Sequence, residues 1–490
     1  MVNYTPFVHI LLFVVSNILT TFNQVLLKNV FFVDLSSKEI LFLNRSLTDS
    51  SITKLNLNMT MKKLITIIFT LAASISAHES HTETLTLTAP EEVGISSERL
   101  NNVAKAMQRY IDRNELAGVV TLISRKGKIV HFESQGWKNK ELGEEMSNDT
   151  IFTIMSMTKP IVSVALMMLY EEGRFLLTDP IEDWIPEITG KKVIVDPECT
   201  QNCKSARREA ASQITFRHVL AHTSGLDPSR DNLDMDEIDL LGRKNTLEET
   251  IVNRAPLPLA FDPGQSWQYG SSTDYVALLV ERVSGKPLKE FLQERIFDPL
   301  DMDDTQYVVP DEKRFRVSSV YSPDGPDRTI KLARTNEYSA RPLFGGDFYG
   351  GVAGLYSTAA DYWRFSQMLL NGGELNGTRL LSPKTINLMI SNHSGDGNVY
   401  IRGPGYSFGL GFGILSNAGE ARDPLTPGSF TWGGAWGTIF FVDPVEEMIG
   451  IMMTQITSYR HLTVRQDFGV TAMQSVVNSN MPVIGYPVVP

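Results

Sequence analysis

One serine and one lysine stand three residues apart directly ahead of an apolar segment. The run Ser156-Met157-Thr158-Lys159 precedes residues 161–172, which are strongly apolar and are followed by Gly173. This pattern predicts a buried helix with Ser156 on its first turn and Lys159 on the same face. Free backbone N–H groups at such a helix start stabilise developing negative charge, and an amine in an apolar cleft can take a hydroxyl proton. The pattern therefore predicts an activated serine nucleophile. Residues 51–54 share the Ser-x-x-Lys spacing, so the position ahead of the helix, and not the spacing alone, favours Ser156.

A second serine competes for this role. Gly405-Tyr406-Ser407-Phe408-Gly409 fits the G-x-S-x-G nucleophile motif, and Asp443 and His461 follow it in the order that an α/β-hydrolase requires. That motif needs a strand before the serine and a helix after it. Here glycines recur at alternate positions from 409 to 413, which favours a bent strand over a helix. We therefore expect Ser407 to pack within a strand.

The surrounding pattern predicts an α+β protein. Residues 118–123 and 128–133 are β-rich runs around a turn, and β-rich runs return at 430–442 and 448–455. Helical spacing occurs at 90–115, 214–222, 245–253, 273–283, 359–370 and 463–478. We expect a sheet built from the N- and C-terminal segments, with a mostly helical subdomain inserted at roughly 150–350. A cleft between these two parts is the natural place for a site.

Composition excludes several classes of protein. The chain has 490 residues, 42% hydrophobic and 21% charged, with a net charge of −11 spread along the sequence. These fractions are ordinary for a folded globular protein and exclude disorder as the whole answer. The acidic balance argues against nucleic acid or an anionic membrane surface as partner.

The N-terminus indicates export. Met61-Lys62-Lys63, an apolar run and small residues up to Ala77 are the parts of a signal peptide, which we place at residues 61–77. We expect translation to start at Met61 or Met59, with residues 1–60 a non-native upstream extension; a genuine N-terminal anchor is the alternative. The expected location is periplasmic or secreted, with membrane contact only through an uncleaved leader.

Two further residue pairs receive plain structural interpretations. Cys199 and Cys203 lie in a polar stretch and could close a small disulfide loop in an oxidising compartment. His218 and His222 have the i, i+4 spacing of a metal pair but lack the glutamate of H-E-x-x-H and a third ligand. We expect these histidines to cap or tie a loop, and we expect no metal and no cofactor.

Five ordered motifs carry a family resemblance. The run at 156–159 resembles the first motif of the serine β-lactamase and penicillin-binding protein superfamily. The other four resemble its class C β-lactamase-like branch, closest to carboxylesterases of the family VIII type. They are residues 214–226, 263–271, 351–358 and Trp432-Gly433-Gly434, which stands where the family has a Lys-Thr-Gly or His-x-Gly triad. The resemblance spans about residues 90–480, and we assign residues 90–490 to this domain. It implies an antiparallel sheet flanked by helices.

The resemblance also implies roles for individual residues. Ser156 would be the acylated nucleophile, with Lys159 and Tyr269 sharing the general-base work. The backbone N–H groups of Ser156 and Ala435 would form the oxyanion hole. The residues expected to contact substrate are Ser271, Trp432, Gly433, Gly434 and Trp436.

Two departures from the family pattern bear on the substrate. Ser271 stands where the tyrosine motif usually ends in Asn, and Trp432 replaces the usual Lys or His. A cation at that place would pair with the carboxylate of a β-lactam or of a peptide terminus, which an indole cannot do. We therefore expect a serine hydrolase acting on small neutral esters. The alternatives are a β-lactamase, a D-amino-acid peptidase, an acyltransferase, or a penicillin-binding protein that holds a cell-wall ligand without turnover.

Overall fold

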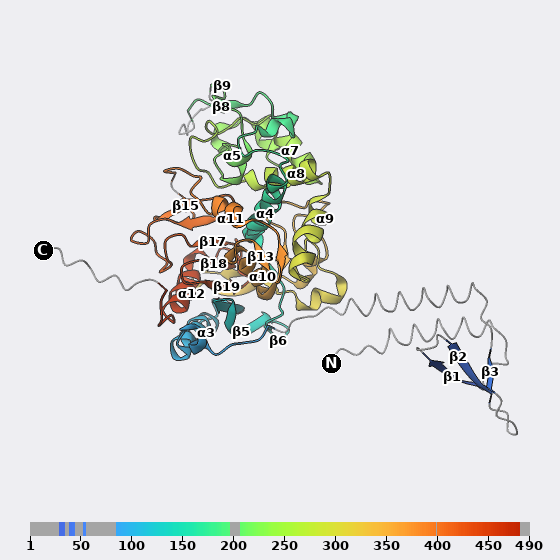
Figure 1. The fold of residues 1–490 in the computed structure, drawn as a ribbon. Helices are drawn as coiled ribbons and strands as arrows, with labels where there is room; N and C mark the ends of the chain where they lie inside the picture. The colour runs from blue at the N-terminus through green and yellow to red at the C-terminus, as the bar shows by residue number, and fades with distance from the viewer. Residues whose placement is uncertain are drawn as a thin grey trace. The chain divides into compact units, whose positions relative to one another are not determined.

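The central sheet has eight antiparallel strands in the order β15-β16-β17-β18-β19-β4-β5-β6 (Figure 1). Its centre joins segments from the two ends of the chain, because β19 pairs with β4 over the whole length of β19. The predicted sheet of N- and C-terminal segments and the predicted α+β class are therefore confirmed. The strands are β4 (Gly118–Arg125), β5 (Lys128–Asn139), β6 (Glu144–Glu145), β15 (Tyr406–Phe408), β16 (Gly413–Leu415), β17 (Phe430–Gly433), β18 (Ile439–Asp443) and β19 (Met448–Met453).

One expected strand is two strands. The β-rich run 430–442 breaks after Gly433 and resumes at Ile439, and β17 and β18 pair across the turn. Within this turn the N–H of Gly437 donates to the carbonyl of Gly434 at 3.1 Å, and Gly437 has φ +99°. Glycine adopts such a conformation without the strain of a side chain, so the glycines in this run end the strand. The single uninterrupted run was a wrong prediction.

Helices α3, α10 and α12 cover the sheet. The helix α3 (Ser97–Asp112) is capped by Ser96, whose side chain accepts a hydrogen bond from the N–H of Arg99, and it packs beside α12 (Val464–Met473). The helix α10 (Ala359–Leu370) contacts β4 and β19. Its Trp363 indole N–H donates to Ser124 Oγ of β4 at 2.8 Å, which fixes the helix on the sheet.

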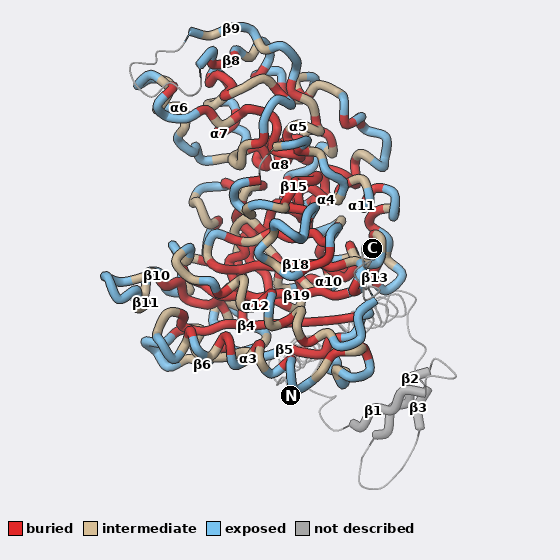
Figure 2. The backbone as a smooth tube through the Cα atoms, turned by 90° about the vertical axis from the view of Figure 1, so that its left-hand side faces the viewer, coloured by how far each residue is buried: buried red, intermediate tan, exposed pale blue. Residues whose placement is uncertain are grey.

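The helix α4 (Thr158–Glu171) is the buried core of the inserted part. Twelve of its fourteen residues are buried, as expected of a helix that is apolar on all sides (Figure 2). It packs against α8 (Ser272–Ser284), which ends at Gly285 in the left-handed conformation. The remaining helices are α5 (Phe216–Leu220), α6 (Met235–Leu240), α7 (Leu247–Arg254), α9 (Leu288–Leu292) and α11 (Pro383–Met389). The inserted region is mostly helical, as predicted.

Short strand pairs complete the fold. The pair β7 (Phe152–Thr153) and β12 (Tyr356–Ser357) places residues 351–358 beside the segment that leads to Ser156. The other pairs are β8 (Lys192–Ile194) with β9 (Arg207–Glu209), β10 (Val320–Asp324) with β11 (Thr329–Arg334), and β13 (Glu374–Leu375) with β14 (Thr378–Arg379).

The structure is a computed structural model that describes residues 85–196, 206–397 and 399–480, together with three strands nearer the N-terminus. The chain divides into two units, residues 1–84 and 85–490. The first unit contains the antiparallel strands β1 (Asn29–Asp34), β2 (Glu39–Asn44) and β3 (Ile52–Lys54). The predicted signal peptide at 61–77 and the predicted disulfide between Cys199 and Cys203 lie outside the described residues. Among the helices of the described residues, none has the length and apolar character needed to cross a membrane.

Candidate active site

Ser156 lies in a short 3₁₀ helix, Met155–Met157, that leads directly into α4. Met155 has φ +48°, a left-handed conformation that a non-glycine residue adopts only when its surroundings hold it there. The surrounding contacts do so: the N–H of Ile154 donates to the carbonyl of Leu355 at 3.0 Å, and the Tyr362 hydroxyl donates to the carbonyl of Met157 at 3.0 Å. The backbone around Ser156 is therefore fixed from both sides.

Lys159 places its amine beside the serine hydroxyl. The side chain is fully buried, and Nζ donates to Ser156 Oγ at 3.3 Å and to the carbonyl of Val352 at 2.9 Å. Nζ also lies 4.6 Å from the centroid of the Tyr269 ring. The first helical turn thus brings together the two residues that the spacing singled out.

A buried carboxylate supports the lysine from behind. Asp274 of α8 accepts a hydrogen bond from the N–H of Val352 at 2.9 Å, and the carbonyl of the same residue receives the Lys159 amine. Burial raises the pKa of Asp274. Sequence reasoning missed both Asp274 and the Val352 carbonyl. The one available signal was a carboxylate on an otherwise apolar helix, five residues after Tyr269.

Tyr269 and Trp432 form a second contact across the site. The Trp432 indole N–H donates to the Tyr269 hydroxyl oxygen at 3.3 Å, and the ring centroids are 5.3 Å apart. Trp432 is only 2% exposed, while Tyr269 is half-buried. The indole therefore provides a hydrogen-bond donor directed at the phenol oxygen.

The two histidines have separate structural roles. His218 completes the cap of α5, where its Nδ1 accepts from the N–H of Thr215 at 3.1 Å, so the capping prediction is confirmed. His222 is buried, with its ring 5.2 Å from the Tyr269 ring and 5.2 Å from the Phe408 ring. Burial, together with the charge of Lys159, holds the pKa of His222 well below its usual value, so the ring is neutral. The described residues contain no group of three or more side chains suited to hold a metal ion.

The residues that follow β17 pack closely against the segment that precedes Ser156. A side chain at Gly434 would collide with the carbonyl of Ile154 and with the Thr438 hydroxyl, so only glycine permits this approach. The next residue, Ala435, is exposed, and among the described residues its N–H finds no acceptor. Ser156 and Ala435 both line one pocket, which leaves the Ala435 N–H available to a bound group.

This pocket has a volume of about 580 Å³. Of the predicted site residues, Ser156, Tyr269, Trp432, Gly433, Gly434 and Ala435 line it. Lys159 is buried directly behind Ser156. The remaining lining residues are Tyr400, Ile401, Arg402, Arg422, Asp423, Tyr459, Arg460, Leu462, Arg465 and Gln466.

Two residues that we expected to contact substrate do not line the pocket. Ser271 precedes α8, and its N–H donates to Asp227 at 2.8 Å. The Trp436 ring packs instead against Tyr338, at 6.0 Å between centroids, and beneath the Arg334 guanidinium. Both residues follow a lining residue closely in sequence, but the local backbone turns their side chains toward other partners.

Ser407 lies in β15, as predicted, and its surroundings differ from those of Ser156. Its hydroxyl shares a hydrogen bond of 2.6 Å with the Ser416 hydroxyl. Asp443 accepts from the backbone N–H groups of Val445 and Glu446, and His461 Nδ1 lies 3.0 Å from the Ser458 carbonyl. Among the described residues, no hydrogen bond joins any two of Ser407, Asp443 and His461.

Known proteins match the chain over most of its length. Residues 103–467 match the Beta-lactamase family. The esterase EstB of Burkholderia gladioli is 29% identical over 373 residues, which cover 71% of this chain and 88% of the relative. Lovastatin esterase of Penicillium rubens is 28% identical over 374 residues, covering 70% of this chain and 90% of the relative. A solved structure titled EstCE1, a hydrolase with promiscuous acyltransferase activity, superimposes with a TM-score of 0.64 at 24% identity, covering 78% of this chain and 99% of that one.

The fold, the Ser156-to-Lys159 geometry and the family match agree. The predicted resemblance is confirmed, and so is the predicted enzyme class. The chain belongs to the Beta-lactamase family and is a serine hydrolase of the β-lactamase and penicillin-binding protein superfamily, with esterases among its relatives.

Proposed function

We propose that this serine hydrolase is a carboxylesterase that forms an acyl-enzyme on Ser156. The observation that carries the proposal is the buried Lys159 amine 3.3 Å from the Oγ of Ser156, which lines a pocket together with Tyr269 and Trp432. A nucleophile and a proton-transfer group within contact of each other are the minimum for covalent catalysis.

Acylation uses the residues around the pocket in a defined order. Ser156 Oγ attacks the ester carbonyl, and its proton passes to the pair formed by Lys159 and Tyr269. The N–H groups of Ser156 and Ala435 stabilise the oxyanion. Collapse of the tetrahedral intermediate breaks the bond to the alcohol oxygen, which takes the proton from the same pair. Water then attacks the acyl-enzyme by the reverse route and releases the acid.

Trp432 favours esters over β-lactams and peptides. Its indole lies at the place where the family has a cation, and its N–H is engaged with the Tyr269 oxygen. A carboxylate adjacent to the reacting carbonyl therefore finds no positive partner in this side chain. Small esters that are neutral around the reacting carbonyl are the simplest substrates that fit. The esterases among the relatives support this choice, whereas transfer of the acyl group to an alcohol would use the same acyl-enzyme.

Intact-mass measurement tests the proposal directly. Protein comprising residues 78–490 is mixed with p-nitrophenyl butyrate and, separately, with nitrocefin, alongside Ser156→Ala and Ser407→Ala. We expect ester turnover that disappears only in Ser156→Ala. Activity that survives Ser156→Ala and disappears in Ser407→Ala would refute the assignment of the nucleophile. A lasting nitrocefin adduct on Ser156 without ester turnover would instead indicate a binding protein.

We also propose that the protein is exported to the periplasm or secreted. The basic, apolar and small-residue pattern at 61–77 supports this proposal. N-terminal sequencing of the protein from the secreted or periplasmic fraction should find a start near residue 78. Recovery of an uncleaved chain in the cytoplasm would contradict it.

A further inference from the structure

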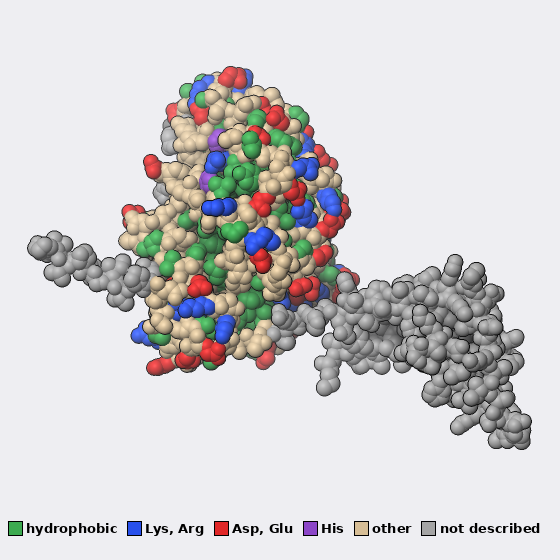
Figure 3. All heavy atoms as spheres, in the orientation of Figure 1, with side chains coloured by type: hydrophobic (Ala, Val, Ile, Leu, Met, Phe, Trp, Pro, Cys, Tyr) green, Lys and Arg blue, Asp and Glu red, His purple; other side chains and the backbone are tan. Residues whose placement is uncertain are grey.

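The pocket lining is far more basic than the chain. The whole sequence has 45 Lys and Arg against 56 Asp and Glu, and acidic and basic side chains are interspersed on the face shown in Figure 3. The pocket is lined by Arg402, Arg422, Arg460 and Arg465, and among the described residues by only one acidic side chain, Asp423. The partners of each arginine show which of these charges are neutralised.

Two of these arginines are engaged within the protein. Arg402 donates to Asp423 at 2.8 Å and to the Tyr406 hydroxyl at 3.1 Å, so the acidic residue of the lining is neutralised. The Arg465 guanidinium donates to the carbonyls of Gly434 and Thr438, which holds the turn after β17 in place. Burial lowers the pKa of Arg465 to about 10, so it stays charged at neutral pH.

The other two arginines are unpaired within the part of the chain that the structure describes. Arg422 and Arg460 line the pocket, and neither forms a hydrogen bond or ion pair with any described residue. They come from separate segments, since Arg422 follows β16 and Arg460 lies in the 3₁₀ helix Tyr459–His461 after β19. The pocket that contains Ser156 thus carries two unneutralised guanidinium groups whose forked N–H donors match a carboxylate.

We propose that Arg422 and Arg460 form a subsite for a carboxylate carried by the substrate on a part other than the reacting ester. This inference rests on the proposed esterase function and names the substrate class, which is esters that contain an acidic group. The Trp432 side chain offers no cation to a carboxylate next to the reacting carbonyl, and the Arg465 guanidinium is engaged by backbone carbonyls. The two free arginines would attract and orient an anionic group farther along the substrate. The positive pocket of an otherwise acidic protein also draws anionic substrates toward the site.

Pairs of substrates that differ only in whether they carry an acidic or a neutral group test the carboxylate subsite. The first pair is 4-(butyryloxy)benzoic acid and 4-(butyryloxy)benzamide, which place an acidic or a neutral group on the alcohol side. The second pair is the mono-4-nitrophenyl esters of glutaric acid and of glutaramic acid, which place it on the acyl side. We measure kcat/KM for the natural chain, Arg422→Gln, Arg460→Gln and the double variant. Arg341→Gln is the control, because Arg341 is also exposed and without a partner among the described residues but does not line the pocket.

In at least one pair we expect kcat/KM to be about tenfold higher for the acidic substrate than for the neutral one, mainly because KM is lower. This factor is what two partly exposed charge contacts contribute. The ratio of kcat/KM for the acidic substrate to kcat/KM for the neutral substrate should fall toward one in the double variant and at high ionic strength. It should stay unchanged in Arg341→Gln. Equal rates for both members of both pairs, or a preference that the double variant retains, would overturn the proposal.

A binding measurement separates this proposal from the proposed function. Titration calorimetry with 4-hydroxybenzoate and with glutarate needs no turnover. If no ester is hydrolysed but either anion binds the natural chain and not the double variant, the subsite stands while the esterase proposal fails. If esters are hydrolysed without charge preference and neither anion binds, the subsite fails while the esterase proposal stands.

Discussion

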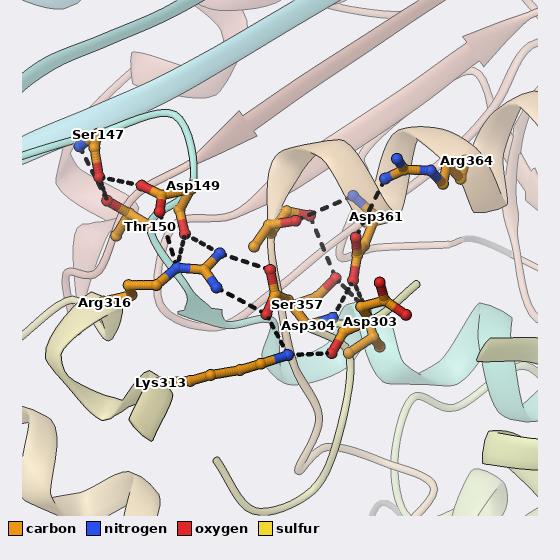
Figure 4. A network of polar contacts seen from close by, with 12 residues as sticks. Ser147, Asp149, Thr150, Asp303, Asp304, Lys313, Arg316, Ser357, Asp361 and Arg364 are labelled. Carbon is orange, nitrogen blue, oxygen red and sulfur yellow. Dashed lines mark hydrogen bonds and ion pairs between the residues drawn. The ribbon is translucent and has the colours of Figure 1, made fainter. Parts of the chain in front are cut away.

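Two polar clusters flank the same short strand pair, β7 with β12, and they differ in how fully their groups are paired. The first contains Ser156 and Lys159, just after β7. The second, drawn in Figure 4, joins Asp304 to Arg316 and to Asp361. It is attached to the strand pair through Arg316, which donates to the carbonyl of Asp149, and through Thr305, which contacts Ser357.

The second cluster is saturated with hydrogen bonds. The Asp304 carboxylate accepts hydrogen bonds from both terminal nitrogens of Arg316, at 2.9 and 2.6 Å, and forms an ion pair with the Lys313 amine at 2.9 Å. Asp361 receives the N–H of Asp304 and the Thr305 hydroxyl, each at 2.9 Å. In the Ser156 cluster the serine and tyrosine oxygens each have one such contact among the described residues, and both face a pocket. A fully paired network holds a fold together, whereas open lone pairs are what a reacting substrate needs.

The largest effect is expected when the amine is removed from the Ser156 cluster, whose serine and tyrosine oxygens face the pocket. Lys159→Met keeps an unbranched side chain in the buried position but removes the proton-transfer group. We expect kcat/KM for p-nitrophenyl butyrate to fall by about 10³-fold or more. Lys313→Met is the matched control, since it removes a lysine from the saturated network, and it should leave kcat unchanged. Activity of Lys159→Met within tenfold of the natural chain would exclude Lys159 as a catalytic residue.

The next effect concerns stability. Arg316→Met removes the cation that two carboxylate oxygens of Asp304 share, and both side chains are mostly buried. Asp304 then keeps only the partly exposed Lys313 amine as a cationic partner, so the free energy of unfolding should fall by about 3 kcal/mol, the lower end of the cost of breaking a buried ion pair. Chemical denaturation measures this change, with the exposed Arg341→Met as control. The activity per folded molecule should stay the same, so a tenfold loss of kcat in the folded variant would contradict a purely structural role for this network.

A smaller effect on the rate tests Tyr269. Tyr269→Phe keeps the ring over the Lys159 amine but removes the oxygen that accepts the Trp432 N–H. We expect kcat to fall by about 10²-fold with little change in KM, because the missing group acts on the proton in the transition state. An unchanged kcat would show that Lys159 works without the phenol.

The sequence predicts those parts of the Ser156 cluster that depend on the residue pattern within a single segment. The apolar helix after Ser156 is visible in composition, and the three-residue spacing then places Lys159 on the same helical face as the serine. The strands at both ends of the chain likewise carry their own pattern. Ser407 was assigned to a strand for a local reason, the alternating glycines, and β15 confirms this assignment.

The features that escaped prediction depend on contacts between distant segments. The Val352 carbonyl reaches Lys159, and Asp274 reaches the N–H of Val352, only because β12 pairs with β7 and α8 packs on α4. Arg422 lies in a loop and Arg460 in a three-residue 3₁₀ helix, where no periodicity indicates which side chains converge. The break after Gly433 was missed because apolar residues continue on both sides of the turn.

The smallest expected effect is a pH dependence that belongs to the saturated cluster alone. Burial, reinforced by the negative charge of Asp304, raises the pKa of Asp361 from 3.8 to about 7. The folded chain therefore holds this proton more tightly than the unfolded chain, so its contribution to stability is fully present below about pH 4 and is lost as the pH rises through 7. In Asp361→Asn this loss should disappear, so that between about pH 6 and about pH 8 the variant gains about 1 kcal/mol relative to the natural chain.

Denaturation midpoints across this range measure the difference, while the pH profile of kcat should be the same for both proteins. A parallel stability profile would show that Asp361 does not titrate there, and a shifted kcat profile would show that the two clusters are coupled through the β7 and β12 pair.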